Sequence, residues 1–309
     1  MLPPDPPLNL TDATSDLALN LAVVLDGTAN QFGLYNSNCV ELYSHLEKSP
    51  LQRTYYNSGI GTYINPRSLS NLAIRKQQIL NRWDMFTAYR LKTYIVNACR
   101  WLSDHYSPGC RLYLFGFSRG AYEVRALAAM LHKVGLIHTG NEEQIDYAYD
   151  LYADPGSAEL AATFKATFSR DVSPVHFVGV WDTVSSVGLF RAKVLPGVSD
   201  TKNIRFIRHA VSLDERRAKF QPELYHTSEG DPIPNVKEVW FAGCHSDVGG
   251  GNRANADLLL GDVPSIWMEW EAMQAGLHIS HMAPILWDFK SLPQQRKIES
   301  LKGIYWLME

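Results

Sequence analysis

The sequence contains little cysteine, no run of like charges and no long apolar segment, and each absence excludes a class of protein. Its four cysteines are scattered over 309 residues without a C-x-x-C pair, so we expect reduced, mostly buried thiols rather than a disulfide framework. The net charge of −3 and the pI near 6.4 lack the excess of positive charge that is typical of nucleic-acid-binding proteins. No apolar stretch approaches the ~20 residues that span a bilayer.

The N-terminus also lacks the features of a secretory signal, because residues 1–7 are rich in proline and contain neither a basic nor an apolar segment. We expect residues 1–18 to form a disordered lead-in and the protein to be cytoplasmic. With 46% hydrophobic and 20% charged residues, the chain has the composition of a soluble globular protein. We expect residues 19–309 to form a single domain, since α/β folds often reach this size undivided.

Short apolar runs alternate with helical patterns along the chain. This alternation is typical of an α/β fold, in which helices cover both faces of a mostly parallel sheet. In such sheets ligands bind beyond the carboxyl ends of the strands, so the loops that follow the strands are the candidate site. Residues 64–82 are expected to form an irregular surface segment. Strands are expected at 21–25, 53–56, 112–115, 175–181 and 236–242, and helices at 40–48, 84–106, 119–133, 204–213 and 264–275, with two more in 142–168.

The most informative motif is Gly116-x-Ser118-x-Gly120, which lies between an expected strand and an expected helix. It is the nucleophile-elbow pattern of serine hydrolases, in which the serine projects from a sharp, strained turn. The flanking glycines remove Cβ atoms that would collide with the neighbouring strand and helix. The turn places Ser118 at a helix N-terminus, where free backbone N–H groups favour a developing negative charge. The alternative is a glycine-rich turn whose serine only caps the helix.

Two later strand ends supply the partners that a serine nucleophile needs. Its base is a histidine held in the right tautomer by a carboxylate, and in α/β-hydrolases the three residues follow in the order Ser, Asp, His. Asp182 and His245 each follow an expected strand, in that order. We therefore predict Ser118, Asp182 and His245 as the catalytic residues. The competing acids are Asp171, Asp200, Asp214 and Asp247, and the competing histidines are His138, His176, His209, His226, His278 and His281.

An oxyanion hole requires two preorganised N–H groups. One is expected from Arg119, directly after the nucleophile, and the other from a neighbouring loop. Gly27 or Thr28 is our first choice, because glycine allows close backbone approach, and the loop 59–61 is the second. We expect the Arg119 side chain to be structural and to pair with a nearby carboxylate such as Asp26 or Asp247.

Six motifs in order resemble a known family. They are Leu25-Asp-Gly-Thr28, Tyr56-Asn-Ser-Gly-Ile-Gly-Thr62, Gly116-Phe-Ser-Arg-Gly-Ala121, Gly179-Val-Trp-Asp-Thr-Val184, Ser212-Leu-Asp-Glu-Arg-Arg217 and His245-Ser-Asp-Val-Gly-Gly-Gly251. The set is similar to the α/β-hydrolase family typified by the catalytic domain of type VI secretion phospholipase effectors. The resemblance begins at about residue 20 and implies an α/β-hydrolase fold with inserted helices or loops as a cap.

The resemblance further implies a serine esterase or lipase of the phospholipase-like kind, with the triad Ser118, Asp182 and His245. Such an enzyme needs no metal or cofactor. Its substrate would be a small-molecule ester, or a lipid ester reached through transient contact with a membrane surface. We expect the loops 62–82, 140–173 and 183–203 to build the substrate pocket, with one of them as a lid.

Two other functions compete with ester hydrolysis. Leu25-Asp-Gly-Thr28 is similar to the D-x-D-G-T motif of aspartyl-phosphate phosphatases, but Val24 stands where the nucleophilic aspartate belongs. A non-catalytic binding scaffold that keeps the fold is the other alternative. Loss of ester hydrolysis on replacing Ser118 would separate the hydrolase from both.

Overall fold

The computed structural model describes residues 18–27, 36–59, 74–172, 174–185, 194–225, 235–251, 260–280 and 297–301. Residues 74–88 and Lys219 are described by their backbone alone. The expected lead-in lies almost entirely outside these ranges, as does Thr28. No helix in the described ranges is long and apolar enough to cross a membrane.

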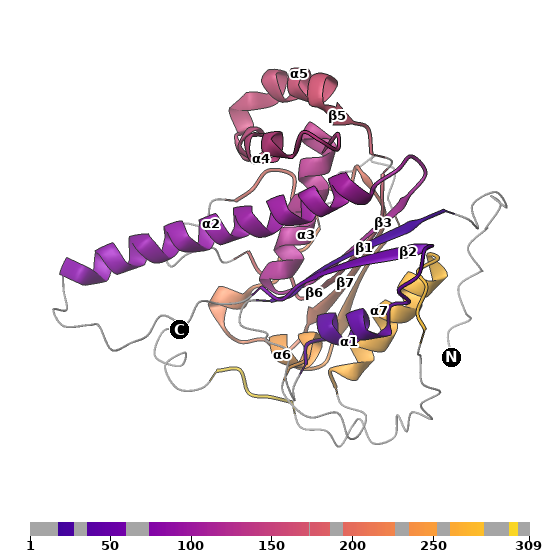
Figure 1. The fold of residues 1–309 in the computed structure, drawn as a ribbon. Coiled ribbons are helices and arrows are strands. Elements are labelled where there is room, and N and C mark those ends of the chain that lie inside the picture. The colour runs from indigo at the N-terminus through magenta and orange to yellow at the C-terminus, as the bar shows by residue number, and fades with distance from the viewer. Residues whose placement is uncertain are drawn as a thin grey trace.

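A six-stranded parallel sheet forms the centre of the molecule, as the sequence predicts (Figure 1). Because every pair of neighbours is parallel, all six carboxyl ends lie along one edge. The inner strands are short and largely buried on both faces, which explains the mostly apolar segments by which several of them are recognised, whereas the two edge strands are partly exposed. In sheet order they are β2 (Gln52–Asn57), β1 (Asn20–Leu25), β3 (Arg111–Phe117), β6 (Val175–Trp181), β7 (Ile204–Ser212) and β8 (Asn235–Phe241).

Helices cover both faces of the sheet, and alternate residues of β1 show how. Leu21, Val23 and Leu25 join the core under α2 (Ile74–His105) and α3 (Arg119–Val134). Ala22 and Val24 join a second core under α1 (Asn38–His45) and α7 (Asp262–Gln274). Successive side chains of a strand point to opposite faces, so β1 contributes to both cores. The predicted α/β architecture, with a doubly covered parallel sheet, is confirmed.

A further pair of helices packs on α3. They are α4 (Ile145–Ala153) and α5 (Ala158–Phe168), separated by the turn Pro155–Ser157, which agrees with the predicted break at 154–156. Lys133, in the last turn of α3, donates to the carbonyl oxygens of Leu151, Tyr152 and Asp154. These bonds hold the connection between the two helices at the end of α3 opposite Ser118. The short strands β4 (Leu136–Ile137) and β5 (Ser169–Arg170) close the unit, and its part in a cap stays a prediction.

Two expectations were wrong. Residues 204–213, expected as a helix, form strand β7, in which Arg208 and His209 are buried among apolar neighbours. Arg208 is paired with Glu271 of α7, which neutralises its buried charge. The other error concerns α2, which begins at Ile74 inside the expected irregular segment and continues for 32 residues. Residues 74–81 are mostly charged or amide residues with good helical propensity, but they lack the apolar stripe by which a helix is detected.

Candidate active site

The turn from β3 to α3 has the geometry of a nucleophile elbow. Ser118 has φ 58° and ψ −121°, a left-handed conformation that is strained for any residue with a Cβ atom. Its N–H donates to the carbonyl oxygen of Trp181 at 3.0 Å, which holds the turn against the end of β6. A Cβ atom at Gly120 would lie 2.1 Å from the carbonyl oxygen of Leu25, and one at Gly116 would lie 2.4 Å from that of Gly120. Only glycine fits at either position.

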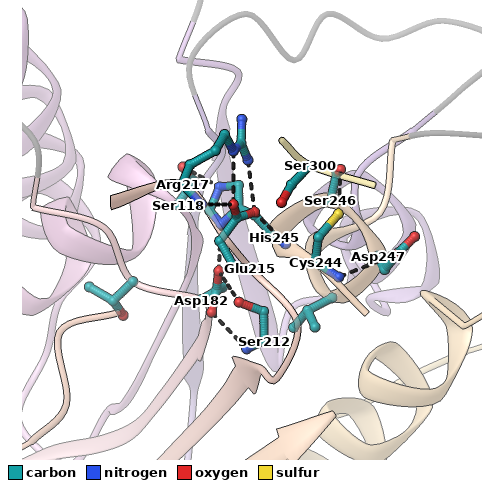
Figure 2. Close-up of polar contacts among 12 residues, drawn as sticks. Ser118, Asp182, Ser212, Glu215, Arg217, Cys244, His245, Ser246, Asp247 and Ser300 are labelled. Carbon is teal, nitrogen blue, oxygen red and sulfur yellow. Dashed lines mark hydrogen bonds and ion pairs between the residues drawn. The ribbon is translucent and has the colours of Figure 1, made fainter. Parts of the chain in front are cut away.

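The three predicted catalytic side chains form one continuous chain of hydrogen bonds (Figure 2). The hydroxyl Oγ of Ser118 lies 2.8 Å from Nε2 of His245, and Nδ1 of His245 lies 2.6 Å from Oδ2 of Asp182. Asp182 has no exposed surface, His245 is 6% exposed, and Ser118 is half-buried. The chain therefore runs from a fully buried carboxylate to a half-buried serine.

Ser212, at the end of β7, completes the environment of Asp182. Its backbone N–H donates to Oδ1 of Asp182 at 2.8 Å, and its hydroxyl donates to Oδ2 at 2.9 Å. With the Nδ1–H of His245, three donors fix the position of this carboxylate. Sequence reasoning did not assign Ser212 a role. Its position at the carboxyl end of a strand would have indicated one, had residues 204–212 been interpreted as a strand.

His245 begins the short helix α6 (His245–Gly249) after β8. Its ring lies between two aromatic rings, with centroids 4.7 Å from Phe117 and 5.1 Å from Phe220. Asp247, the competing acid, accepts from the backbone N–H of Cys244 at 3.0 Å and caps this helix. The structure therefore shows Asp247 as the turn-forming residue that we expected.

Glu215 anchors the backbone of His245 through a hydrogen bond (Figure 2). Its carboxylate accepts from the N–H of His245 at 3.2 Å, and from the N–H, Nε and Nη2 of Arg217 at 2.8, 2.9 and 3.0 Å. The Arg217 guanidinium lies 3.5 Å from the ring centroid of Phe220, the residue that packs on His245. Residues 212–217 thus hold Asp182 and His245 in position, a role that the sequence analysis did not predict.

The pKa of the Glu215 carboxyl is lowered to about 2. Burial raises it, but the hydrogen bonds from the Arg217 side chain and from the N–H groups of Arg217 and His245 outweigh burial. A depressed pKa means that Glu215 stabilises the fold fully above its unfolded pKa of about 4.3, and that this contribution is lost as the pH falls toward 2.

Glu215→Gln is expected to lower the free energy of unfolding at pH 7 by roughly 2–3 kcal/mol, because it removes a charge that pairs with the Arg217 guanidinium and accepts from several backbone N–H groups. The difference from the wild type should shrink between pH 5 and about pH 2, where the wild-type carboxylate is itself protonated. Urea unfolding at pH 7, 5 and 3 measures both effects. Glu299→Gln is the matched control, because Glu299 forms an exposed pair with Arg216 and should change stability little. Equal effects of the two variants at pH 7 would contradict the assignment.

His209, a competing base, lies in β7 behind the loop of Asp182. Its Nε2 accepts from the N–H of Thr183 at 3.2 Å, so the ring proton is on Nδ1, which donates to Glu238 at 2.8 Å. Burial lowers the pKa of His209, and the hydrogen bond to Glu238 opposes this only in part. His209 is therefore a neutral structural residue that supports the loop after β6.

The loop after β1 lies against the elbow, where a second oxyanion donor would be needed. The backbone N–H of Arg119 is at the first turn of α3, where N–H groups have no partner inside the helix. The N–H of Gly27 donates to Oδ1 of Asp26 at 2.6 Å. Thr28 lies outside the described residues. The backbone at Gly59 passes close to this loop, since a Cβ atom there would lie 2.5 Å from the carbonyl oxygen of Asp26.

Asp26 is a buried acceptor in this loop. Its Oδ2 accepts from Ser37 at 2.5 Å and from Tyr56 at 3.0 Å, so its carboxylate ties β1, β2 and α1 together. In the described part of the chain, Arg119 forms no ion pair with Asp26 or Asp247, contrary to our expectation. In the same part, no group of three or more His, Cys, Asp or Glu side chains is placed to hold a metal ion.

Comparisons with known proteins agree on the fold. The model of the type VI secretion phospholipase effector Tle1-like catalytic domain matches residues 19–271. Protein YEL023C of Saccharomyces cerevisiae, itself uncharacterised, is 36% identical over 240 residues, or 72% of this chain and 34% of that protein. An uncharacterised Pseudomonas aeruginosa structure matches 86% of this chain and 48% of its own, with a TM-score of 0.50 and 20% identity.

A Tle1 effector, solved bound to the VgrG spike of the type 6 secretion system, is a weaker structural match. Its TM-score is 0.39 and its identity 19%, over 78% of this chain and 52% of that one. The chain thus spans about a third of the yeast relative and about half of each solved chain.

Proposed function

We propose that this chain, which belongs to the family of type VI secretion Tle1-like phospholipase effector catalytic domains, is a serine hydrolase of lipid esters. Membership of the family supports ester hydrolysis on lipids in general. The observation that carries the mechanism is the hydrogen-bonded chain from Ser118 through His245 to Asp182. Its order along the sequence and its position at the carboxyl edge of the sheet are those of an α/β-hydrolase triad.

We propose a role for each member of the chain, based on this geometry. Since Nδ1–H of His245 donates to Asp182, the imidazole presents the lone pair of Nε2 to the hydroxyl of Ser118. As Ser118 Oγ attacks the ester carbonyl, its proton moves to Nε2, and the buried Asp182 stabilises the imidazolium that forms. The imidazolium then returns the proton to the leaving alcohol, which leaves an acyl-enzyme on Ser118. Water, deprotonated by the same Nε2, releases the acid and restores the serine.

The oxyanion of the tetrahedral intermediate needs backbone donors beside Ser118. We assign one to the N–H of Arg119, which starts α3 and receives the favourable end of the helix dipole. The second comes from the loop after β1, at Gly27 or Thr28. In the structure the Gly27 N–H is bonded to its neighbour Asp26, so its use would require a local rearrangement of that bond.

Release of fatty acid identifies the ester class. Purified protein is expected to hydrolyse p-nitrophenyl esters and to release fatty acid from phosphatidylcholine vesicles. The ratio of the two rates should depend on the acyl chain length that the substrate pocket accepts. A series of p-nitrophenyl esters from acetate to palmitate, measured beside the vesicles, reports that ratio. Hydrolysis of p-nitrophenyl acetate and butyrate alone would restrict the proposal to an esterase of short-chain, water-soluble esters. Failure to cleave any ester would favour the non-catalytic scaffold.

A further inference from the structure

A second polar cluster lies one residue beyond the nucleophile, between α2 and α3. Arg119 and Glu123 occupy successive turns of α3, and Arg90 and Tyr94 occupy successive turns of α2. Tyr94, Glu123 and Arg90 are close enough to Arg119 for each to shift its pKa. Nη1 of Arg90 donates to the hydroxyl of Tyr94 at 3.2 Å. Two guanidinium groups therefore gather beside the turn that presents Ser118.

The charge of Arg119 has no counterpart within the ranges that the structure describes. The side chain is half-buried, and burial lowers the pKa of its guanidinium. No hydrogen bond or ion pair joins it to a residue of those ranges. A guanidinium taken partly out of water without a partner is unfavourable, whereas one that receives an anionic ligand is stabilised.

Glu123 is the obvious partner, being four residues along the same helix, but it does not neutralise Arg119. It is only 6% exposed and forms no hydrogen bond or ion pair within the described residues. Burial raises the pKa of its carboxyl well above the ordinary value, and the charge of Arg119 counters this only in part. A buried carboxyl without donors favours its neutral form, so Glu123 leaves the positive charge of Arg119 without a neutralising partner among the described residues.

We infer that Arg119 binds a phosphate group carried by the substrate beside the scissile ester. The inference rests on the proposed function, since the phosphate and the ester belong to one molecule. Arg119 follows Ser118 directly, so its Cα lies about 3.8 Å from that of the nucleophile, and the ester is within reach of its long side chain. The planar fork of N–H donors on a guanidinium matches two phosphate oxygens at once. Arg119 would thus select esters that carry phosphate over neutral esters.

A binding experiment tests this without turnover. In protein with Ser118→Ala, decyl phosphate is expected to bind, and adding Arg119→Gln should weaken that binding by about 10- to 100-fold, as measured by titration calorimetry. Arg119→Lys should weaken it less, because it keeps the charge and loses the fork. Arg100→Gln is the matched control, since Arg100 lies on α2 and its partners are Asn97 and Asp146. Unchanged affinity with Arg119→Gln would overturn the inference.

Two further measurements distinguish a substrate phosphate from free phosphate, and failure of this inference from failure of the proposed function. Inorganic phosphate that binds as tightly as decyl phosphate would overturn a substrate subsite and indicate a site for free phosphate. With Ser118 intact, Arg119→Gln should lower kcat/KM for phosphatidic acid at least about tenfold more than for diacylglycerol with the same acyl chains. Equal losses on the two lipids would also overturn the inference. A wild type that cleaves neither lipid yet binds decyl phosphate through Arg119 would refute hydrolysis and leave the phosphate site standing.

Discussion

Ser118→Ala is expected to reduce ester hydrolysis on the order of 10⁴- to 10⁶-fold, because the hydroxyl oxygen is the atom that bonds to the substrate. The variant should stay folded. The elbow is held by the N–H of Ser118 on the carbonyl oxygen of Trp181 and by the close packing of Gly120 on Leu25, and neither contact involves the lost Oγ. Release of p-nitrophenol, with circular dichroism and thermal unfolding of the same samples, measures both expectations.

Ser246→Ala is the control for this result. Ser246 is on α6, next to His245, but its hydroxyl contacts the sulfur of Cys244 and not the imidazole. This variant should retain most of the activity. A fluorophosphonate probe should label the wild type on Ser118 and leave the Ser118→Ala protein unlabelled, as seen by peptide mass spectrometry. Undiminished turnover in Ser118→Ala, or a label on another serine, would refute the mechanism.

The elements that could be predicted from the sequence are those whose buried residues are apolar and whose boundaries are marked within the segment itself. The strand 175–181 and the helix that starts at Arg119 are mostly apolar and are bounded by Pro174 and Gly135, and both lie where the sequence predicts. The three candidate catalytic residues followed from the same elements, because parallel strands bring their carboxyl ends to one edge. Their proximity is thus a consequence of topology, whereas their catalytic roles stay predictions until measured.

Strand β7 could not be predicted in this way, because its burial depends on partners from distant segments. Arg208 and His209 interrupt the apolar run, and the remaining apolar residues recur with a helical period. In the structure Arg208 is neutralised by Glu271, and His209 is bonded to Glu238. Neither pairing is visible in the local sequence. The error on β7 then concealed Ser212, since a residue on a helix end has no defined place at the edge of the sheet.

Asp182→Asn is expected to lower kcat by about 10⁴-fold while the site keeps its shape. Asp182 accepts the Nδ1 proton of His245 at 2.6 Å, and Ser212 supplies both of its other donors. The backbone N–H of Ser212 can only donate, so the asparagine carbonyl oxygen takes the Oδ1 position. The NH₂ group then takes the Oδ2 position, where it faces His245 Nδ1 and the Ser212 hydroxyl, which can turn to accept from it. The imidazole must then carry its proton on Nε2, which becomes a donor toward Ser118 and can no longer accept the hydroxyl proton. Steady-state hydrolysis of a p-nitrophenyl ester measures the loss.

Asp214→Asn is the control, because it makes the same chemical change at a carboxylate near the site. Asp214 also lies in the 212–217 motif, but its carboxylate accepts from the N–H of Gly243 and from Lys297, both at 2.7 Å, and it does not touch the triad. This variant should keep most of the wild-type kcat, even if the loop loses some stability. The change of tautomer has a second consequence: proton NMR of Asp182→Asn should show loss of the low-field Nδ1–H resonance that a short His–Asp hydrogen bond produces. An Asp182→Asn enzyme with wild-type kcat would show that His245 does not depend on this carboxylate, and Asp182 would lose its place in the mechanism.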